Sequence, residues 1–95
     1  MNNFNFWLRC GSFLGCSAII LGAFGSHLLK SKLNPTQLES YKIAVYYQLF
    51  HAIAIISFAH ISITLNNSII STANLFILIG TLLFSGSIYL YLLTD

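Results

Sequence analysis

The chain has 95 residues, and only 6% of them are Asp, Glu, Lys or Arg, against about 25% in ordinary soluble domains. Hydrophobic residues make up 57% and aromatic residues 15%, and the net charge is +2. A soluble domain of this size needs charged groups to cover its wet surface, so the composition excludes one. The small positive charge also provides no face for nucleic acid. We therefore expect a single all-α domain, residues 1–95, whose solvent is the lipid bilayer.

The first predicted membrane span is the uncharged run 10–29. Twenty helical residues rise about 30 Å, which is the thickness of the hydrocarbon core. Arg9 precedes this run, and Trp7 lies where an aromatic belt would meet the headgroups. The run also has features of a secretory signal peptide, with small residues at Ala23 and Gly25 before a possible cleavage site. A retained helix and a cleaved leader are both compatible with these residues.

A short polar segment, 30–42, follows and holds four of the six charged side chains. Within it, Asn34, Pro35 and Gln37 have the spacing of N-cap, N1 and N3, a capping-box start of a helix. The second helix is therefore predicted to begin in the polar segment, before the chain enters the membrane.

The remaining run, 43–94, contains no charged residue and is too long for one span. The polar cluster at 66–68 is the place where it can turn back. We predict spans at 43–65 and 69–93, arranged as an antiparallel hairpin. The chain is thus expected to be a polytopic membrane protein with three transmembrane helices.

The distribution of basic residues predicts the orientation of these helices. Lys30, Lys32 and Lys42 flank the first loop, whereas Arg9 is the single basic residue on the opposite side. By the positive-inside rule, the 30–42 loop is cytoplasmic and the N-terminus faces out. The bacterial inner (plasma) membrane is the expected location.

Small residues repeat along one face of two predicted helices, as they do where transmembrane helices pack closely. In the first helix this face contains four residues that we predict to be packing residues: Gly11, Gly15, Gly22 and Ser26. In the third helix the corresponding residues are Gly80 and Ser87, seven positions apart. Both faces are predicted to contact another helix.

Polar residues inside the second span are candidates for a functional site, because such groups are costly to leave unpaired in lipid. Tyr47, Gln48 and His51 lie within two turns of each other. They are either a hydrogen-bonded packing cluster or contacts for a bound haem or quinone. His27 lies about 8 Å from the depth of His51, and His60 projects from the opposite face of its helix. We therefore predict no metal site within one chain, and the sequence leaves the identity of any cofactor unknown.

Catalytic patterns are absent from the sequence. An intramembrane serine protease would need Gly-x-Ser-Gly, but Leu83 occupies the first position before Ser85. No carboxylate lies in any predicted span to support proton-coupled transport. We predict no catalytic residues and no enzymatic activity. The leading interpretation is an accessory or scaffold protein, followed by a cofactor-binding module centred on His51 and by a small oligomeric channel or carrier.

Three segments together resemble a known family: GAFGSH at 22–27, YQLFHA at 47–52 and GTLLFSGSIYL at 80–90. Their order and spacing are similar to those of the membrane-protein family called domain of unknown function 423, which includes YgdD-like and transmembrane protein 256-like proteins. The resemblance implies a retained first helix and a four-helix bundle, and it brings no assigned activity.

Two features depart from the family pattern. Ser26 stands where the family usually has Ala, and the chain stops at Asp95, where family members continue into a fourth helix. We therefore expect a C-terminally short member whose uncovered faces meet lipid, a second copy of the chain or another membrane subunit.

Overall fold

The computed structural model describes residues 3–65 and 67–94, and the side chains of all of these except Asn3, Ser26 and Asn67. Every regular element in this part of the chain is helical. The elements are α1 (Asn3–Ile20), the π-helical segment η1 (Leu21–Gly25), α2 (Ser26–Leu29), α3 (Pro35–Ile61) and α4 (Asn67–Thr94). The expected all-α fold is confirmed.

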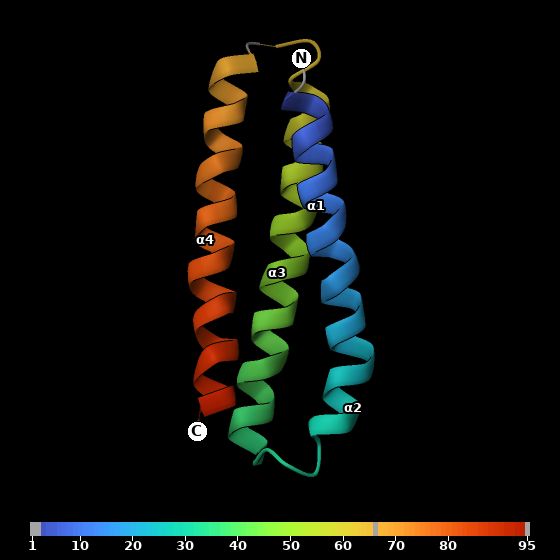
Figure 1. Ribbon diagram of the computed structural model, residues 1–95, viewed down its shortest axis with the longest axis vertical. Coiled ribbons are helices and arrows are strands. Elements are labelled where there is room, and N and C mark those ends of the chain that lie inside the picture. Colours follow the sequence, from blue (N-terminus) through green and yellow to red (C-terminus); the bar gives the residue numbers. More distant parts are fainter. Residues whose placement is uncertain (1–2, 66, 95) are drawn as a thin grey trace.

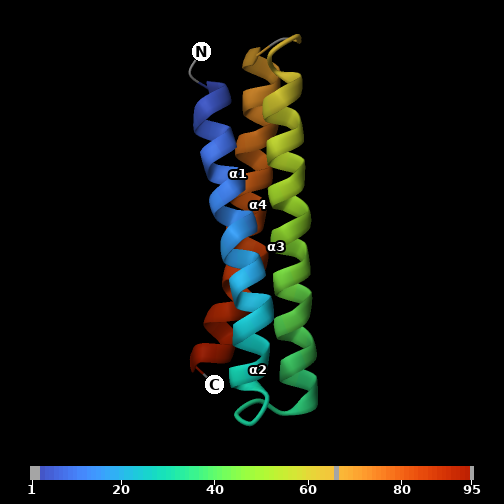
Figure 2. The ribbon, with the colours of Figure 1, turned by 90° about the vertical axis from the view of Figure 1, so that its right-hand side faces the viewer.

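The first three elements form one rod, so the described residues contain three helices long and apolar enough to cross a membrane: Phe4–Leu29, Pro35–Ile61 and Ser68–Thr94. Consecutive helices run antiparallel in a slab whose longest dimension is 47 Å (Figure 1). A bilayer with its headgroup regions is about 40–45 Å thick. The turn after α3 and the start of α1 lie at one end, and the loop before α3 and the end of α4 lie at the other (Figures 1 and 2).

α3 is the central helix and packs against α1 on one side and α4 on the other (Figure 1). Six of its seven buried residues alternate at spacings of four and three, as in a coiled coil, at positions 41, 45, 48, 52, 55 and 59, and Ala44 is the seventh. Three of them are alanines, at positions 44, 52 and 59, and each is at most 1% exposed. Small side chains let the helix backbones approach closely, so dispersion contacts can hold the helices together in lipid.

The outer surface is apolar, which is the reverse of a soluble helical bundle. Phe13 is 72% exposed, Phe76 68% and Leu83 68%. In water such a surface would drive aggregation, whereas hydrocarbon chains accept it at no cost. The exterior therefore matches a lipid environment along the helices.

The start of α3 agrees with its prediction. Asn34 Oδ1 accepts a hydrogen bond from Gln37 N at 2.7 Å, and Asn34 N donates to Gln37 Oε1 at 3.1 Å, with Pro35 at the first helical position. The capping box is confirmed. It gives the backbone N–H groups of Asn34 and Gln37 each a side-chain oxygen as acceptor, and the helix therefore begins within the polar segment.

The end of α3 differs from the predicted span, which extended to residue 65, because the helix stops at Ile61. Ser62 Oγ donates to the carbonyl of Ala59, and Thr64 Oγ1 donates to the carbonyl of Ile61. These hydroxyls compete for the carbonyls that a continuing helix would use. Asn66, predicted to be part of this turn, lies outside the described residues. How deeply the bilayer covers each helix stays a prediction, with spans at 10–29, 43–65 and 69–93.

Candidate functional site

Gln48 lies at the centre of the bundle and joins all three helices. Its side chain is 5% exposed. Nε2 donates to the carbonyl of Leu14 at 2.9 Å and to Ser17 Oγ at 2.8 Å on α1, while Oε1 accepts from the hydroxyl of Tyr89 on α4 at 2.8 Å. The Leu14 carbonyl can only accept, so the amide nitrogen must face α1 and the amide oxygen must face α4. This arrangement uses three of the four hydrogen bonds that the amide can make.

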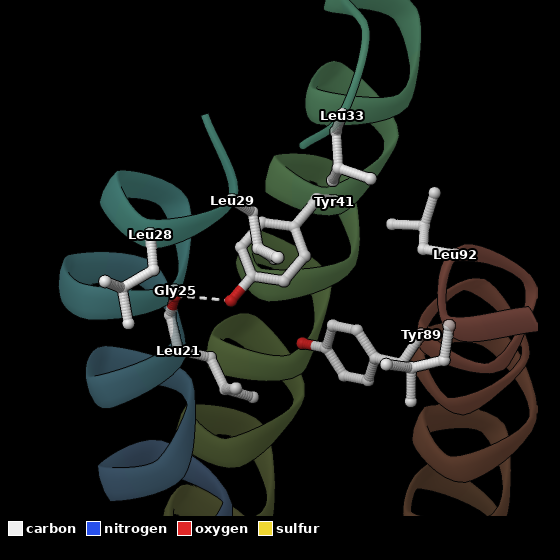
Figure 3. A pocket seen from close by; sticks show the side chains of 9 residues that line it. Leu21, Gly25, Leu28, Leu29, Leu33, Tyr41, Tyr89 and Leu92 are labelled. Atoms are coloured by element: carbon white, nitrogen blue, oxygen red, sulfur yellow. Dashed lines mark hydrogen bonds between the residues drawn. The ribbon is translucent and has the colours of Figure 1, made fainter. Parts of the chain in front are cut away.

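A second polar contact holds the π-helical segment of the first rod. The hydroxyl of Tyr41, on α3, donates to the carbonyl of Leu21 at 2.5 Å (Figure 3). A Cβ atom at Gly25 would overlap that hydroxyl. Short π-helical segments recur at functional positions because they re-aim backbone groups. Here η1 directs the carbonyl of Leu21 at α3. Gly25, the second glycine of the GAFGSH motif, leaves the space that the Tyr41 hydroxyl occupies.

Tyr47 and His51 lie apart from the buried Gln48, on the outer side of α3. His51 Nδ1 is 2.6 Å from the carbonyl of Tyr47, and because a carbonyl only accepts, Nδ1 carries a proton. In the neutral imidazole, Nε2 is then the acceptor or ligand atom. The Tyr47 ring stacks on Phe84 of α4 with centroids 4.6 Å apart, and it is 46% exposed. The sequence predicted one cluster of three, whereas the structure has a core amide and a separate surface stack.

The described histidines do not form part of a metal-binding cluster. In the range 3–65 and 67–94, no three His, Cys, Asp or Glu side chains are close enough to hold one ion. His27 and His60 are both exposed.

The predicted packing residues divide into two groups. On the first rod, a Cβ at Gly11 of α1 would lie 2.5 Å from Ile56 Cγ1, and one at Gly22 of η1 would lie 3.2 Å from Val45 Cγ1, so both glycines lie against α3. Gly15 is looser, with Ala52 Cβ at 3.6 Å. On α4, nothing lies within 4 Å of a Cβ at Gly80, and Ser87 is exposed, with its hydroxyl bonded to its own helix. The side chain of Ser26 lies outside what the structure describes.

Several residues of the interhelical network were missed by sequence reasoning. Ser85 Oγ donates to the carbonyl of Ala44 at 2.8 Å, and Asn74 Nδ2 donates to that of Ile55 at 3.2 Å, which links α4 to α3. Trp7 Nε1 donates to Ser71 Oγ at 3.0 Å and links α1 to α4. The missed signal is the spacing of polar residues on α4, since positions 74, 81, 85 and 89 share one helical face. In lipid such residues join helices by hydrogen bonds.

Apolar side chains outside and hydrogen-bonded polar groups between the helices define an all-α polytopic integral membrane protein. Residues 21–95 match the family described as "Protein of unknown function (DUF423)". This chain belongs to that family, which confirms the resemblance seen in its sequence.

The curated relatives are similarly named membrane proteins. UPF0382 membrane protein SAB0533 of Staphylococcus aureus (strain bovine RF122 / ET3-1) is 33% identical over 90% of this chain and 69% of its own length. UPF0382 inner membrane protein YgdD of Escherichia coli (strain K12) is 33% identical over 88% of this chain and 64% of its own length. UPF0382 membrane protein YwdK of Bacillus subtilis (strain 168) is 33% identical over 82% of this chain and 64% of its own length. The chain thus spans about two thirds of the length of these relatives. No solved structure matches it.

Proposed function

We propose that this chain is a non-enzymatic accessory or scaffold component of the bacterial inner membrane. The observation that carries the proposal is the state of Gln48, whose donors and acceptor are used to hold α1 and α4 against α3. A side chain engaged in this way stabilises the bundle and has little capacity left for a substrate. The hydroxyl of Ser85 is likewise bonded to the Ala44 carbonyl instead of to a general base.

The partner of this scaffold is a second copy of the chain or another membrane subunit, which packs on α4. The small residues of α1 already lie against α3, whereas those of α4 are turned away from the other helices, with open space at Gly80 and an exposed Ser87. A repeat of seven residues keeps such a face in contact with a neighbouring helix that supercoils around it.

In the cell, the 30–42 loop faces the cytoplasm and the N-terminus faces out. Three of the four basic side chains, Lys30, Lys32 and Lys42, support this orientation because they lie at or beside this loop. The name of the relative YgdD, an inner membrane protein, supports the location.

Substitution of the α4 face tests the proposal. The double variant Gly80→Leu and Ser87→Leu should lose its partner while keeping its fold, because each new side chain enters open space in the single chain. Gly86→Leu is the matched control, since a Cβ there also has nothing within 4 Å but points to a different side of α4. Native mass spectrometry after mild extraction measures the number of chains. Equal oligomer content in the double variant and the control would refute an α4 interface.

A second candidate function is a haem- or quinone-binding module, and the geometry of His51 favours it. Its Nδ1 proton is held by the Tyr47 carbonyl, so the neutral ring presents Nε2 to a ligand beside the stacked rings of Tyr47 and Phe84. The chain would then purify with a stoichiometric non-protein mass that is absent from His51→Ala. A bare chain in both proteins removes this candidate.

A further inference from the structure

A pocket lies between the first helical rod and α4, at the end of the molecule that carries the 30–34 loop. Its volume is about 320 Å³ (Figure 3). Six leucines, two tyrosines and a glycine line it. Two of these leucines, Leu28 and Leu93, are 69% and 84% exposed, so the pocket opens to the outside of the bundle.

The pocket arises from the way the helices are held. α1 and α4 meet near the other end of the bundle, through the hydrogen bond between Trp7 and Ser71. At the loop end, Leu21 and Gly25 of η1 form one wall, α4 forms the opposite wall with Leu92, and Tyr41 of α3 lies behind (Figure 3). The space is therefore a product of the fold itself.

The chemistry of the lining selects a hydrocarbon ligand. Both tyrosine hydroxyls are already engaged, Tyr41 with the Leu21 carbonyl and Tyr89 with Gln48. The other lining side chains are leucines, which offer dispersion contacts and no hydrogen bonds. A ligand with polar groups inside the pocket would lose its hydrogen bonds to water without replacement.

The surroundings of the pocket favour a single chain of methylene groups. The pocket opens past Leu28 and Leu93 to the outer surface of the bundle, where hydrocarbon chains are the solvent. One flexible lipid tail can lie along such an apolar groove and make dispersion contacts with its leucines.

The charge at the rim selects the headgroup. Leu29 and Leu33 line the pocket, and Lys30 and Lys32 lie in the same tight turn, in which the backbone N–H groups of residues 32 and 33 both donate to the carbonyl of Leu29. Both lysines are exposed. Basic side chains at a membrane surface attract anionic headgroups.

We propose that this pocket binds one acyl chain of an anionic phospholipid whose phosphate pairs with Lys30 and Lys32. The leucine lining holds the tail, and the two ammonium groups at the rim distinguish an anionic headgroup from a zwitterionic one. This site is separate from the α4 face of Gly80 and Ser87, so either proposal can fail without the other.

The first test removes the charge. The full chain is reconstituted in phosphatidylcholine vesicles containing increasing phosphatidylglycerol, extracted mildly, and its retained lipids are weighed by native mass spectrometry. We expect one phosphatidylglycerol per chain and no retained phosphatidylcholine. Lys30→Gln with Lys32→Gln should raise the half-saturating phosphatidylglycerol fraction by about fivefold for each lysine removed. These side chains are exposed, so the fold should survive their replacement.

Lys42→Gln is the matched control for charge. Lys42 is at the same end of the molecule but lines a different groove, with Gly22, Val45 and Tyr46. Its loss should shift half-saturation by less than about twofold, since Lys42 does not line the pocket and lies outside the turn of Lys30 and Lys32. Equal effects of all three lysines, or equal retention of the two lipids, would overturn the proposal.

The second test fills the pocket. Leu92→Trp adds bulk to the lining, and Leu90→Trp adds the same bulk on the same helix at a position that is 63% exposed and outside the lining. We expect Leu92→Trp to lose the retained phosphatidylglycerol and Leu90→Trp to keep it. Loss of a second copy of the chain in Leu92→Trp, with no lipid retained by the parent, would instead assign the pocket to a protein partner and reject the lipid.

Discussion

Gln48 shows how one residue in a membrane helix can fix the positions of two others. Its amide bonds to Leu14, Ser17 and Tyr89, which come from α1 and α4. Interhelical hydrogen bonds in membrane proteins average about 0.6 kcal/mol each. Removing Gln48 also leaves the Tyr89 hydroxyl without its acceptor, which adds to the cost in stability. We expect Gln48→Leu to destabilise the bundle by about 1–3 kcal/mol. Unfolding by SDS titration in mixed micelles, followed by circular dichroism, measures this difference.

Ser87→Ala is the control for that measurement. Ser87 is also a polar residue in an apolar helix, but its hydroxyl bonds to the Phe84 carbonyl within α4. Its removal should change the free energy of unfolding by less than about 0.5 kcal/mol. If the two variants were equally stable, the Gln48 network would contribute nothing measurable between helices.

Gly25 supports a second prediction for a single residue, because its missing side chain makes room for the hydroxyl of Tyr41. Gly25→Ala should destabilise the protein by about 1–3 kcal/mol through overpacking. In a Tyr41→Phe background the cost should fall, since the hydroxyl that meets the new methyl is gone. The four proteins form a double-mutant cycle, and thermal unfolding in detergent gives its coupling energy.

Gly86→Ala controls for the intrinsic preference of helices for alanine. A Cβ at Gly86 meets nothing within 4 Å, so this variant should be neutral or more stable by up to about 1 kcal/mol. A coupling energy near zero between Gly25→Ala and Tyr41→Phe would show that the two residues do not share the space.

The sequence identified Gln48 as a candidate site residue but grouped it with Tyr47 and His51, whereas its hydrogen-bond partners are Leu14, Ser17 and Tyr89. Residues three apart on a helix differ by about 60° around its axis, which is enough to put Gln48 in the core and His51 at its edge. Apolar residues lie on every side of α3, so its hydropathy does not reveal which side faces the other helices. The partners of Gln48 on α1 and α4 come from distant parts of the chain and were therefore not predictable from local spacing.

At the scale of elements, helix starts were easier to predict than helix packing. The capping box at Asn34 and Gln37 is a local signal and was read directly from the sequence. The π-helical segment at 21–25 carries no such signal, because it forms where Tyr41 of another helix bonds the Leu21 carbonyl. The alanines of α3 were also overlooked, since alanine is common in every helix.

The α1–α3 interface predicts a gradient of tolerance along α1. Gly11→Ala should destabilise the bundle by about 1–3 kcal/mol, because the new methyl would lie 2.5 Å from Ile56 Cγ1 and 3.1 Å from the Ala52 carbonyl. Gly15→Ala should be neutral or slightly stabilising, because its methyl makes an ordinary 3.6 Å contact with Ala52. SDS titration of both variants compares them directly, and a larger loss at Gly15 would contradict this interface.

At the scale of the whole molecule, three helices leave a large apolar exterior, and the bundle is not closed around α3. α1 and α4 are joined near Trp7 and Ser71 and separated by the pocket at the loop end. Composition was sufficient to predict membrane helices, and the positions of the polar segments 30–42 and 66–68 were sufficient to predict their number. It could not predict this uneven closure, which depends on which side chains from distant segments meet.

The orientation of the molecule is testable because its two ends carry exposed turn residues. In a background with Cys10 and Cys16 replaced by Ala, Ser31→Cys should be protected from a membrane-impermeant maleimide in intact cells, and Thr64→Cys should react. Ser31 lies in the loop flanked by Lys30 and Lys32, which the positive-inside rule assigns to the cytoplasm, and Thr64 lies in the turn at the opposite end. Labelling of both cysteines after permeabilisation is the control for reactivity. Labelling of Ser31→Cys and protection of Thr64→Cys in intact cells would reverse the topology, and the lysines would then face outward.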